Sequence, residues 1–293
     1  MPVDDVVLRV KGLHVRYGRR EILKGINFDL RRGEALGIVG GNGSGKSTTL
    51  KAVLGLIPYD GVVRWSVPLE NVGYVPQRPA LYLDFTVAEN IAVFSRLVRS
   101  PVDVDPLLEY FGLKPFLSKP ARLLSGGYQK VLNLVLSLLS DPQVLLLDEP
   151  TAELDYSMRE KLMDFLHEFV RSGRAVMMVT HVPGEVEEVC TRTIVLGHGK
   201  VIAEGPPDRI LEQANLPYVV RVYGNFEIPP PLPNFKNVEL SRVEGDFIEL
   251  RVSYSSLLDG MEEILSFARS VGADRIVLEE PDILRAVEMG VVK

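Results

Sequence analysis

The sequence of 293 residues predicts an α/β protein with a mostly parallel sheet, followed by a small α+β domain. Short apolar runs typical of buried strands alternate with helical patterns along most of the chain. A glycine-rich loop lies between one such strand and a helix. Near Asn215 the pattern changes, and the proline-rich stretch IPPPLP (228–233) interrupts any helix or central strand. We therefore expect two domains, at 1–215 and 216–293.

The larger domain is expected to begin with three strands, at 6–18, 26–34 and 34–40. The last of these is apolar and leads into the glycine-rich loop. A helix is expected at 86–100, because it opens with the Thr86-x-x-Glu89 capping box and continues with apolar residues at helical spacing. Further helices are predicted at 46–57, 105–112, 126–140 and 158–173, and buried strands at 143–150 and 174–181.

The smaller domain is expected to contain a strand, a hairpin, a helix and another strand. In order, these lie at 218–224, 237–253, 257–271 and 275–280, and a final short helix begins at Pro281. No internal repeat is present.

Composition excludes several classes of protein. The net charge of −6 gives no general attraction to nucleic acid or anionic lipid, so no nucleic-acid partner is expected. Cys190 is the only cysteine, which excludes a disulfide scaffold, and we expect a small buried side chain there. The first residues lack the apolar core of a signal peptide. No apolar run approaches the roughly 18 residues of a membrane span, so the chain is not expected to cross a membrane by itself.

The stretch GGNGSGKST (40–48) has the pattern of a phosphate-binding loop. Glycines let backbone N–H groups approach phosphate oxygens, and the following helix N-terminus favours negative charge. Lys46 is predicted to reach the β- and γ-phosphates, and the Ser47 hydroxyl to bind Mg²⁺. The predicted nucleotide-binding residues of this loop are Gly40, Asn42, Gly43, Ser44, Gly45, Lys46, Ser47 and Thr48.

An acidic pair ends the apolar strand VLLLDEP (144–150). Asp148 is suited to hold Mg²⁺, and Glu149 could polarise an attacking water. Taken alone, such a pair could also cap the next helix.

The segment LLSGGYQK (123–130) resembles the signature motif of ATP-binding-cassette (ABC) ATPases. Other positions match that family in the same order: Tyr17 in VRYG, Gln77 in YVPQ, the D-loop TAELD (151–155) and His181 in MVTH. The resemblance covers roughly residues 5–212. It implies a P-loop ABC ATPase domain with a parallel-sheet core, an antiparallel β subdomain and a helical subdomain.

The resemblance also implies a mechanism. In this family two ATPase domains meet head to tail and trap two ATP molecules with Mg²⁺. Ser125, Gly126 and Gly127 of one protomer would contact the γ-phosphate held by Lys46 of the other, which could be an identical or a different chain. The remaining implied roles are adenine stacking for Tyr17, nucleotide contact for Asp155, general base for Glu149, γ-phosphate and water positioning for His181, and Mg²⁺ binding for Gln77.

Some positions depart from the family pattern. Tyr128 replaces the usual glutamine of the signature motif, and Val131 and Leu136 stand where arginines are common. Hydrolysis is still expected, because Glu149 and the signature serine and glycines are present. The acidic cluster EVEEV (185–189) is interpreted as a solvated helix face.

The C-terminal region resembles the small ferredoxin-like domain that follows the ATPase in many exporters of drugs, antibiotics or polysaccharides. It implies an ATPase subunit on the cytoplasmic face of the cell membrane, with transmembrane permease subunits as separate chains. The permease would insert a short helix near residues 78–100. The alternatives are an importer subunit, for example for a metal ion, a soluble non-transport ABC ATPase, and a degenerate nucleotide-binding regulator. The C-terminal domain could itself be a dimer-stabilising spacer or a ligand sensor.

Overall fold

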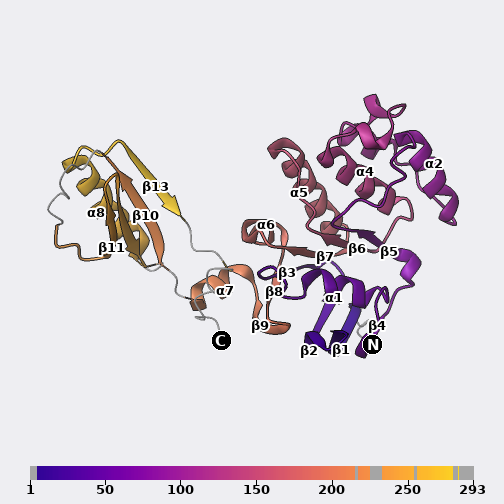
Figure 1. Ribbon diagram of the computed structural model, residues 1–293, viewed down its shortest axis with the longest axis horizontal. Coiled ribbons are helices and arrows are strands. Elements are labelled where there is room, and N and C mark those ends of the chain that lie inside the picture. Colours follow the sequence, from indigo (N-terminus) through magenta and orange to yellow (C-terminus); the bar gives the residue numbers. More distant parts are fainter. Residues whose placement is uncertain (1–4, 215–216, 225–232, 254–255, 280–282, 284–293) are drawn as a thin grey trace. The chain divides into compact units, whose positions relative to one another are not determined.

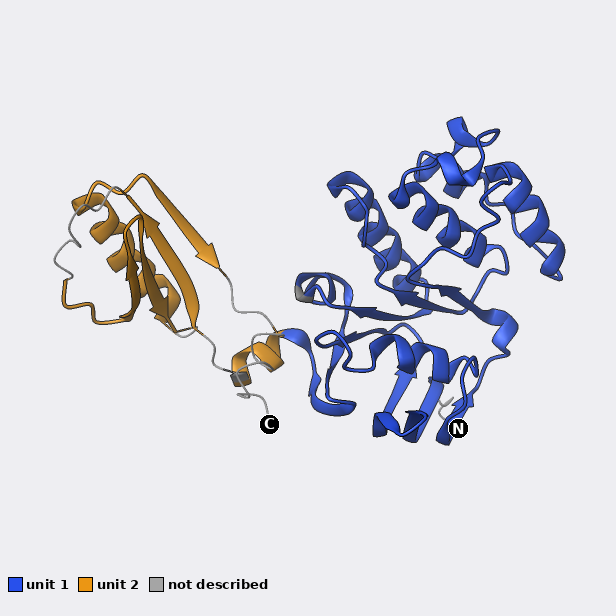
Figure 2. Cartoon of the chain, viewed as in Figure 1, with its two compact units in different colours: residues 1–207 blue, residues 208–293 orange. Residues whose placement is uncertain are grey.

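The computed structural model describes residues 5–214, 217–224, 233–253, 256–279 and 283 (Figure 1). The chain divides into two compact units, Met1–Pro207 and Asp208–Lys293 (Figure 2). Because residues 215 and 216 lie outside the described part, the domain boundary predicted there stays a prediction.

The core of the first unit is a six-stranded sheet in the order β5-β6-β7-β3-β8-β9. All neighbouring pairs are parallel except β8 and β9, which are antiparallel. Every residue of three central strands is buried, as expected for a parallel sheet covered on both faces. The strands are β3 (Ala35–Val39), β5 (Val72–Val75), β6 (Val144–Asp148), β7 (Ala175–Thr180), β8 (Arg192–Gly197) and β9 (Lys200–Gly205).

A second, antiparallel sheet has the order β2-β1-β4, with β1 (Val6–Tyr17), β2 (Arg20–Arg31) and β4 (Asp60–Trp65). Helix α1 (Lys46–Val53) contacts both sheets, and one apolar cluster joins all three layers. This confirms the predicted parallel core and antiparallel β subdomain. The sequence prediction missed β4, and it began β2 too late because the polar residues at its start hide the alternation.

The remaining part of the first unit is helical (Figure 1). The predicted capping box is confirmed, because the Thr86 hydroxyl accepts from Glu89 N at 3.1 Å and Glu89 Oε2 accepts from Thr86 N at 2.8 Å. None of the helices in the described residues is long and apolar enough to span a membrane. The helices are α2 (Val87–Leu97), α3 (Asp105–Tyr110), α4 (Gly126–Leu138), α5 (Tyr156–Arg171) and α6 (Pro183–Val189), with short 3₁₀ turns at Leu69–Asn71, Lys114–Phe116 and Ala121–Leu123.

The second unit begins with α7 (Pro207–Ala214), which crosses the division between the units, and is otherwise an antiparallel sheet packed against one helix. The sheet order is β11-β12-β10-β13, and α8 (Leu257–Ser270) packs on β11 and β12 over an apolar core. The two strands connected by α8, β12 and β13, are separated by β10, which is the split β-α-β arrangement of ferredoxin-like domains. The strands are β10 (Tyr218–Tyr223), β11 (Val238–Glu244), β12 (Phe247–Val252) and β13 (Arg275–Glu279). The strand, hairpin and helix predictions are confirmed, whereas the helix predicted from Pro281 lies outside the described residues.

Candidate functional site

The predicted chemical residues lie at one edge of the central sheet. Parallel neighbours end at the same edge, so the segments that follow β3, β5, β6 and β7 meet there. Gly40 follows β3, Gln77 follows β5, Asp148 ends β6 and His181 follows β7. The fold therefore collects residues that are far apart in the sequence.

The glycine-rich loop folds around the Lys46 side chain. Lys46 Nζ donates hydrogen bonds to the carbonyl oxygens of Gly40 at 2.7 Å and Gly41 at 3.3 Å. Gly43 (φ 77°) and Gly45 (φ 111°) have left-handed backbones, which glycine adopts without strain. Gly45 is the N-cap of α1 and provides no side-chain cap, which leaves the first N–H groups of the helix for an anion.

Two further details concern the packing of this loop and its polar groups. A methyl group at Gly40 would lie 2.2 Å from the carbonyl oxygen of Leu196, so only glycine fits there. The Ser44 hydroxyl is buried and has no hydrogen-bond partner among the described residues. Buried polar atoms are normally paired, so a bound group is a suitable partner for it.

Ser47 and Asp148 form a pair of oxygen ligands. Ser47 Oγ donates to Asp148 Oδ1 at 2.9 Å. Burial raises the pKa of Asp148, the hydrogen bond from Ser47 opposes that rise, and the neighbouring Glu149 adds to it. Hydroxyl and carboxylate oxygens suit Mg²⁺. Gln77 is exposed, and within the described part of the chain no hydrogen bond joins it to Ser47 or Asp148.

Glu149 and His181 are in direct contact. Glu149 Oε2 lies 2.7 Å from His181 Nδ1 and accepts from the His181 backbone N–H at 3.3 Å. Glu149 is buried and has a left-handed backbone with φ 51°, an uncommon conformation for a residue with a side chain. Its own N–H donates to the Val179 carbonyl at 2.9 Å, which holds the start of the loop against β7.

Lys46 is close enough to Glu149 and Asp148 to interact electrostatically with both carboxylates. Burial lowers the pKa of Lys46, and the carboxylates of Glu149 and Asp148 oppose that shift. The site therefore combines one buried amine with two buried carboxylates.

The signature segment packs against the loop after Glu149. Ser125 is the N-cap of α4, and its hydroxyl accepts from Tyr128 N at 3.4 Å. A methyl group on Gly126 would lie 1.7 Å from Glu153 Oε2, and one on Gly127 would lie 2.9 Å from the Glu153 carbonyl oxygen. Among the described residues, no hydrogen bond links these three signature residues to the loop at 40–48.

Two other predicted residues lie at element ends. Tyr17 ends β1 with 51% of its surface exposed, so its ring is open to solvent. Asp155 is the N-cap of α5, where Oδ1 accepts from Met158 N at 2.8 Å. Asn42 and Thr48 lie on the loop at 40–48. Asn42 is exposed, and Thr48 is half-buried.

The interpretation of residues 185–189 as a solvated face is wrong for Glu185. This residue is buried, and Oε2 accepts from the Thr180 hydroxyl at 2.8 Å. The signal was present in the sequence, because Glu185 shares a helix face with Val189, four residues later, and Val189 is buried.

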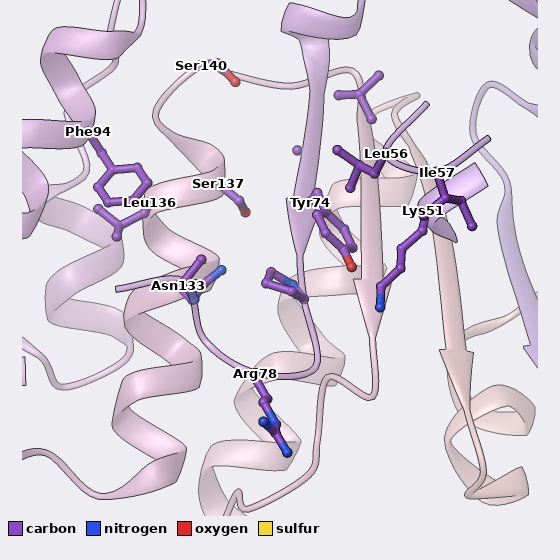
Figure 3. Close-up of a pocket in the computed structure, with 14 residues that line it drawn as sticks. Lys51, Leu56, Ile57, Tyr74, Arg78, Phe94, Asn133, Leu136, Ser137 and Ser140 are labelled. Carbon is purple, nitrogen blue, oxygen red and sulfur yellow. Dashed lines mark hydrogen bonds between the residues drawn. The ribbon is translucent and has the colours of Figure 1, made fainter. Parts of the chain in front are cut away.

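A groove of about 680 Å³ lies between the region of Gln77 and the helical segment (Figure 3). Phe94 of α2, Leu136 of α4 and Tyr74 of β5 contribute to its walls, and Arg78 lies at one end. Burial raises the pKa of Tyr74 to about 12, and the negative charge of Asp148 adds to the rise.

Comparison with known proteins gives a consistent result. A profile described as "ABC transporter" matches residues 23–152, and one described as an AAA domain matches residues 119–187. The chain is 36% identical over 234 residues to the Nod factor export ATP-binding protein I of Ralstonia nicotianae, covering 75% of this chain and 73% of that protein. It is 33% identical over 257 residues to the protein of the same name from Rhizobium sp., covering 83% and 84%.

Solved structures agree with this relationship. A structure described as the ATP-binding subunit of an ABC transporter has a TM-score of 0.66 and 28% identity, covering 71% of this chain and 92% of that one. The structure of cbiO1 from Clostridium perfringens, described as part of the ABC transporter complex cbiONQ, has a TM-score of 0.62 and 29% identity, covering 72% and 92%. The chain belongs to the ATP-binding subunits of ABC transporters, the family that hydrolyses ATP to power transport.

Proposed function

We propose that the chain is the ATPase subunit of an ABC exporter and works as a head-to-tail dimer with two bound MgATP. The proposal that this site hydrolyses ATP rests on the contact of 2.7 Å between Glu149 Oε2 and His181 Nδ1. Lys46 and Asp148 lie beside this contact. The export direction is supported by the relatives that are named Nod factor export ATP-binding proteins.

The loop at 40–48 binds the phosphates of ATP in this proposal. The Lys46 amine exchanges its bonds with the loop carbonyls for phosphate oxygens, and the unpartnered Ser44 hydroxyl donates to one of them. Tyr17, with its exposed ring, stacks on adenine. The remaining contacts come from backbone N–H groups and side chains of Gly40, Asn42, Gly43, Gly45, Ser47 and Thr48.

Ser47 and Asp148 would hold Mg²⁺, and Gln77 would offer a further oxygen ligand. The hydroxyl–carboxylate pair at 2.9 Å supports this assignment, because both groups offer the hard oxygen ligands that Mg²⁺ prefers. When bound, Mg²⁺ neutralises charge on the phosphate oxygens.

Glu149 acts as the general base. Its carboxylate takes a proton from the water whose oxygen attacks the γ-phosphorus, while the bond from that phosphorus to the ADP oxygen breaks. His181, held against the same carboxylate, keeps the γ-phosphate and the water in line. The proton then leaves Glu149 with the phosphate product or to solvent.

A second protomer completes each site. Ser125, Gly126 and Gly127 at the N-terminus of α4 form an anion site for the γ-phosphate held by the partner protomer, and Asp155 of the same protomer borders it.

The groove between Tyr74 and Phe94 receives a short cytoplasmic helix of the permease subunits, which are separate chains. Its apolar walls and the Arg78 end suit an amphipathic helix. The chain is thus peripheral, on the cytoplasmic face of the membrane. Residues 216–293 form an accessory domain of the exporter type.

The hydrolytic proposal is tested with Glu149→Gln, which keeps the shape of the side chain but removes the base. We expect ATP binding to be retained, turnover to fall at least about 100-fold, and an ATP-bound dimer to accumulate in size-exclusion chromatography. Glu168→Gln removes an exposed carboxylate that pairs with Arg171, and it should leave turnover unchanged. Unchanged turnover in Glu149→Gln would exclude Glu149 as the base.

The transport proposal is tested by purifying the tagged chain from its own cells in mild detergent. We expect a multi-span protein in stoichiometric amount, whose architecture distinguishes an exporter from an importer. Recovery of the chain only with soluble partners would contradict the transport proposal.

A further inference from the structure

Glu185 carries a buried carboxylate next to the Glu149–His181 pair. The residue is 2% exposed. Its Oε2 accepts from the Thr180 hydroxyl at 2.8 Å, and its Oε1 accepts from the Thr151 hydroxyl. A buried carboxylate is costly unless it is hydrogen-bonded, and these two donors satisfy both of its oxygens.

The two threonines belong to the segments that carry the reacting side chains. Thr151 is two residues after Glu149, in the loop that follows β6, and Thr180 ends β7 immediately before His181. Glu185 belongs to a third element, α6. Its carboxylate therefore connects the segment after β6 with the end of β7. In this way Glu185 links the two segments that carry Glu149 and His181.

The Thr180 hydroxyl has one proton to donate, and two carboxylates lie within hydrogen-bond distance of it. Glu185 Oε2 lies 2.8 Å from Thr180 Oγ1, and Glu149 Oε2 lies 3.4 Å from it. The nearer carboxylate accepts the hydrogen bond, because a hydroxyl has only one proton to donate. Val182 N donates to the same hydroxyl oxygen at 3.0 Å, which orients it further. Glu149 thus keeps His181 as its principal hydrogen-bond partner.

The helix that carries Glu185 is fixed to the framework of the domain. Val186 and Val189 are buried, and α6 packs on β3 and β7. On the other side of the helix, Glu188 Oε2 pairs with Arg159 Nη2 of α5 at 2.6 Å, a partly exposed ion pair that contributes little to this anchoring. Since α6 is anchored in this way, Glu185 holds the two loop segments in place.

We propose that Glu185 is a positioning residue for ATP hydrolysis, which holds Thr151 and Thr180 and so fixes Glu149 against His181. This inference rests on the proposed function of Glu149. Glu185 does not contact the phosphate loop through any hydrogen bond among the described residues, so it acts on turnover and leaves ATP binding unaffected.

The test compares Glu185→Gln with Glu188→Gln in the full chain. The glutamine amide oxygen still accepts a hydrogen bond from one hydroxyl, but its NH₂ group is a donor. The second threonine hydroxyl therefore loses its acceptor and must direct its proton elsewhere. We expect kcat to fall about 10-fold or more while KM for ATP changes less than about twofold, as for groups that orient reactants. Glu188→Gln loses an equal charge on the same helix, and it should have the kcat of the wild type.

A double-mutant cycle with Thr151→Val separates positioning from loss of packing. Because Glu185 and Thr151 act through one hydrogen bond, the double variant should have nearly the kcat of Glu185→Gln alone. Effects that multiply, or an unchanged kcat in Glu185→Gln, overturn the inference. If Glu185→Gln does not fold, as judged by its thermal unfolding, Thr151→Val alone must show the same kcat loss at constant KM.

Glu149→Gln measured in parallel separates the two claims. If Glu149→Gln is inactive and Glu185→Gln is fully active, only the role of Glu185 is wrong. If Glu149→Gln retains turnover, the proposed function itself fails.

Discussion

Lys130 Nζ donates a hydrogen bond to the backbone carbonyl of Glu149. Lys130 belongs to the signature helix and is buried, and burial lowers its pKa while the carboxylates of Glu153 and Asp148 oppose that shift. The bond holds Glu149 in its left-handed conformation, which costs about 1–3 kcal/mol for a residue with a side chain. The signature helix and the proposed general base are therefore mechanically connected within one chain.

Lys130→Met tests this connection, because methionine has a similar length but no donor. The Glu149 carbonyl loses its partner, so the loop can relax away from the productive geometry. We expect kcat to fall about 10-fold and the Kd for ATP to change less than about twofold, measured by steady-state turnover and equilibrium nucleotide binding. Lys161→Met is the matched control, since Lys161 of α5 also donates from Nζ to a backbone carbonyl, that of Tyr110 at the end of α3. An equal loss of kcat in both variants would contradict a specific role for Lys130.

Gly40 is a position where the fold excludes a side chain. A methyl group there would lie 2.2 Å from the Leu196 carbonyl oxygen and 2.6 Å from Ser44 Oγ, and the backbone atom cannot move away cheaply. Gly40→Ala should lower the free energy of unfolding by about 1–3 kcal/mol and weaken ATP binding. Urea unfolding and nucleotide titration measure the two effects.

Gly41→Ala is the control for stability. A methyl group at Gly41 meets no atom within 4 Å, and its backbone is not left-handed. Its free energy of unfolding should therefore stay within about 0.5 kcal/mol of the wild type. Equal destabilisation by both substitutions would show that the close approach to Leu196 is not the cause.

Much of this site could be predicted from the sequence, because each chemical residue stands at the end of a recognisable strand or helix. Lys46 and Asp148 were identified from the phosphate-loop and strand-end patterns, and His181 from the resemblance to ABC ATPases. The parallel order of the strands brings the three residues to one edge of the sheet. Glu185 was missed because a run of acidic residues resembles a solvated face, and only the packing of α6 decides which of them is buried. Likewise, β4 and β5 were not assigned, since strands of four to six residues that contain a glycine give no clear alternation.

Tyr128, the departure from the signature pattern, packs away from the predicted phosphate site. Its ring lies 4.8 Å from that of Phe116 in the helical segment. Tyr128→Gln should therefore retain turnover within about twofold but lower the free energy of unfolding by about 1–3 kcal/mol through lost aromatic packing. Tyr128→Phe keeps the ring and should change neither quantity. A gain or loss of turnover in both variants would place the hydroxyl in the chemistry instead.

The proposed boundary after residue 215 can be tested with an internal reporter. Trp65 is the only tryptophan, and its Nε1 donates to the Val53 carbonyl at 2.8 Å within the first unit. A chain without residues 216–293 should keep the wild-type tryptophan emission spectrum and bind ATP with a Kd within about threefold, a difference below 1 kcal/mol. An unfolded emission spectrum would mean that the first unit depends on the second.

The buried position of Cys190 predicts how its thiol reacts at alkaline pH. Burial raises the pKa of the Cys190 thiol, and the carboxylates of Glu185 and Glu34 add to the rise. Because the thiolate is the reactive form, the native thiol should resist a disulfide reagent such as Ellman's at about pH 9, where a free thiol with a pKa of about 8.5 is mostly ionised. After unfolding in guanidinium, one thiol per chain should react rapidly.

The raised pKa of Cys190 also makes the free energy of unfolding decrease with rising pH. Since the pKa is higher in the folded state, the folded protein retains a proton that the unfolded chain loses above about pH 8.5. The contribution of Cys190 to stability is complete below that pH and declines as the pH rises toward the folded-state value. Cys190→Ala removes this dependence, so its free energy of unfolding should fall less steeply between about pH 8 and pH 10 than that of the wild type. Equal slopes in urea unfolding, or rapid labelling of the native thiol, would show that the thiol is exposed to solvent.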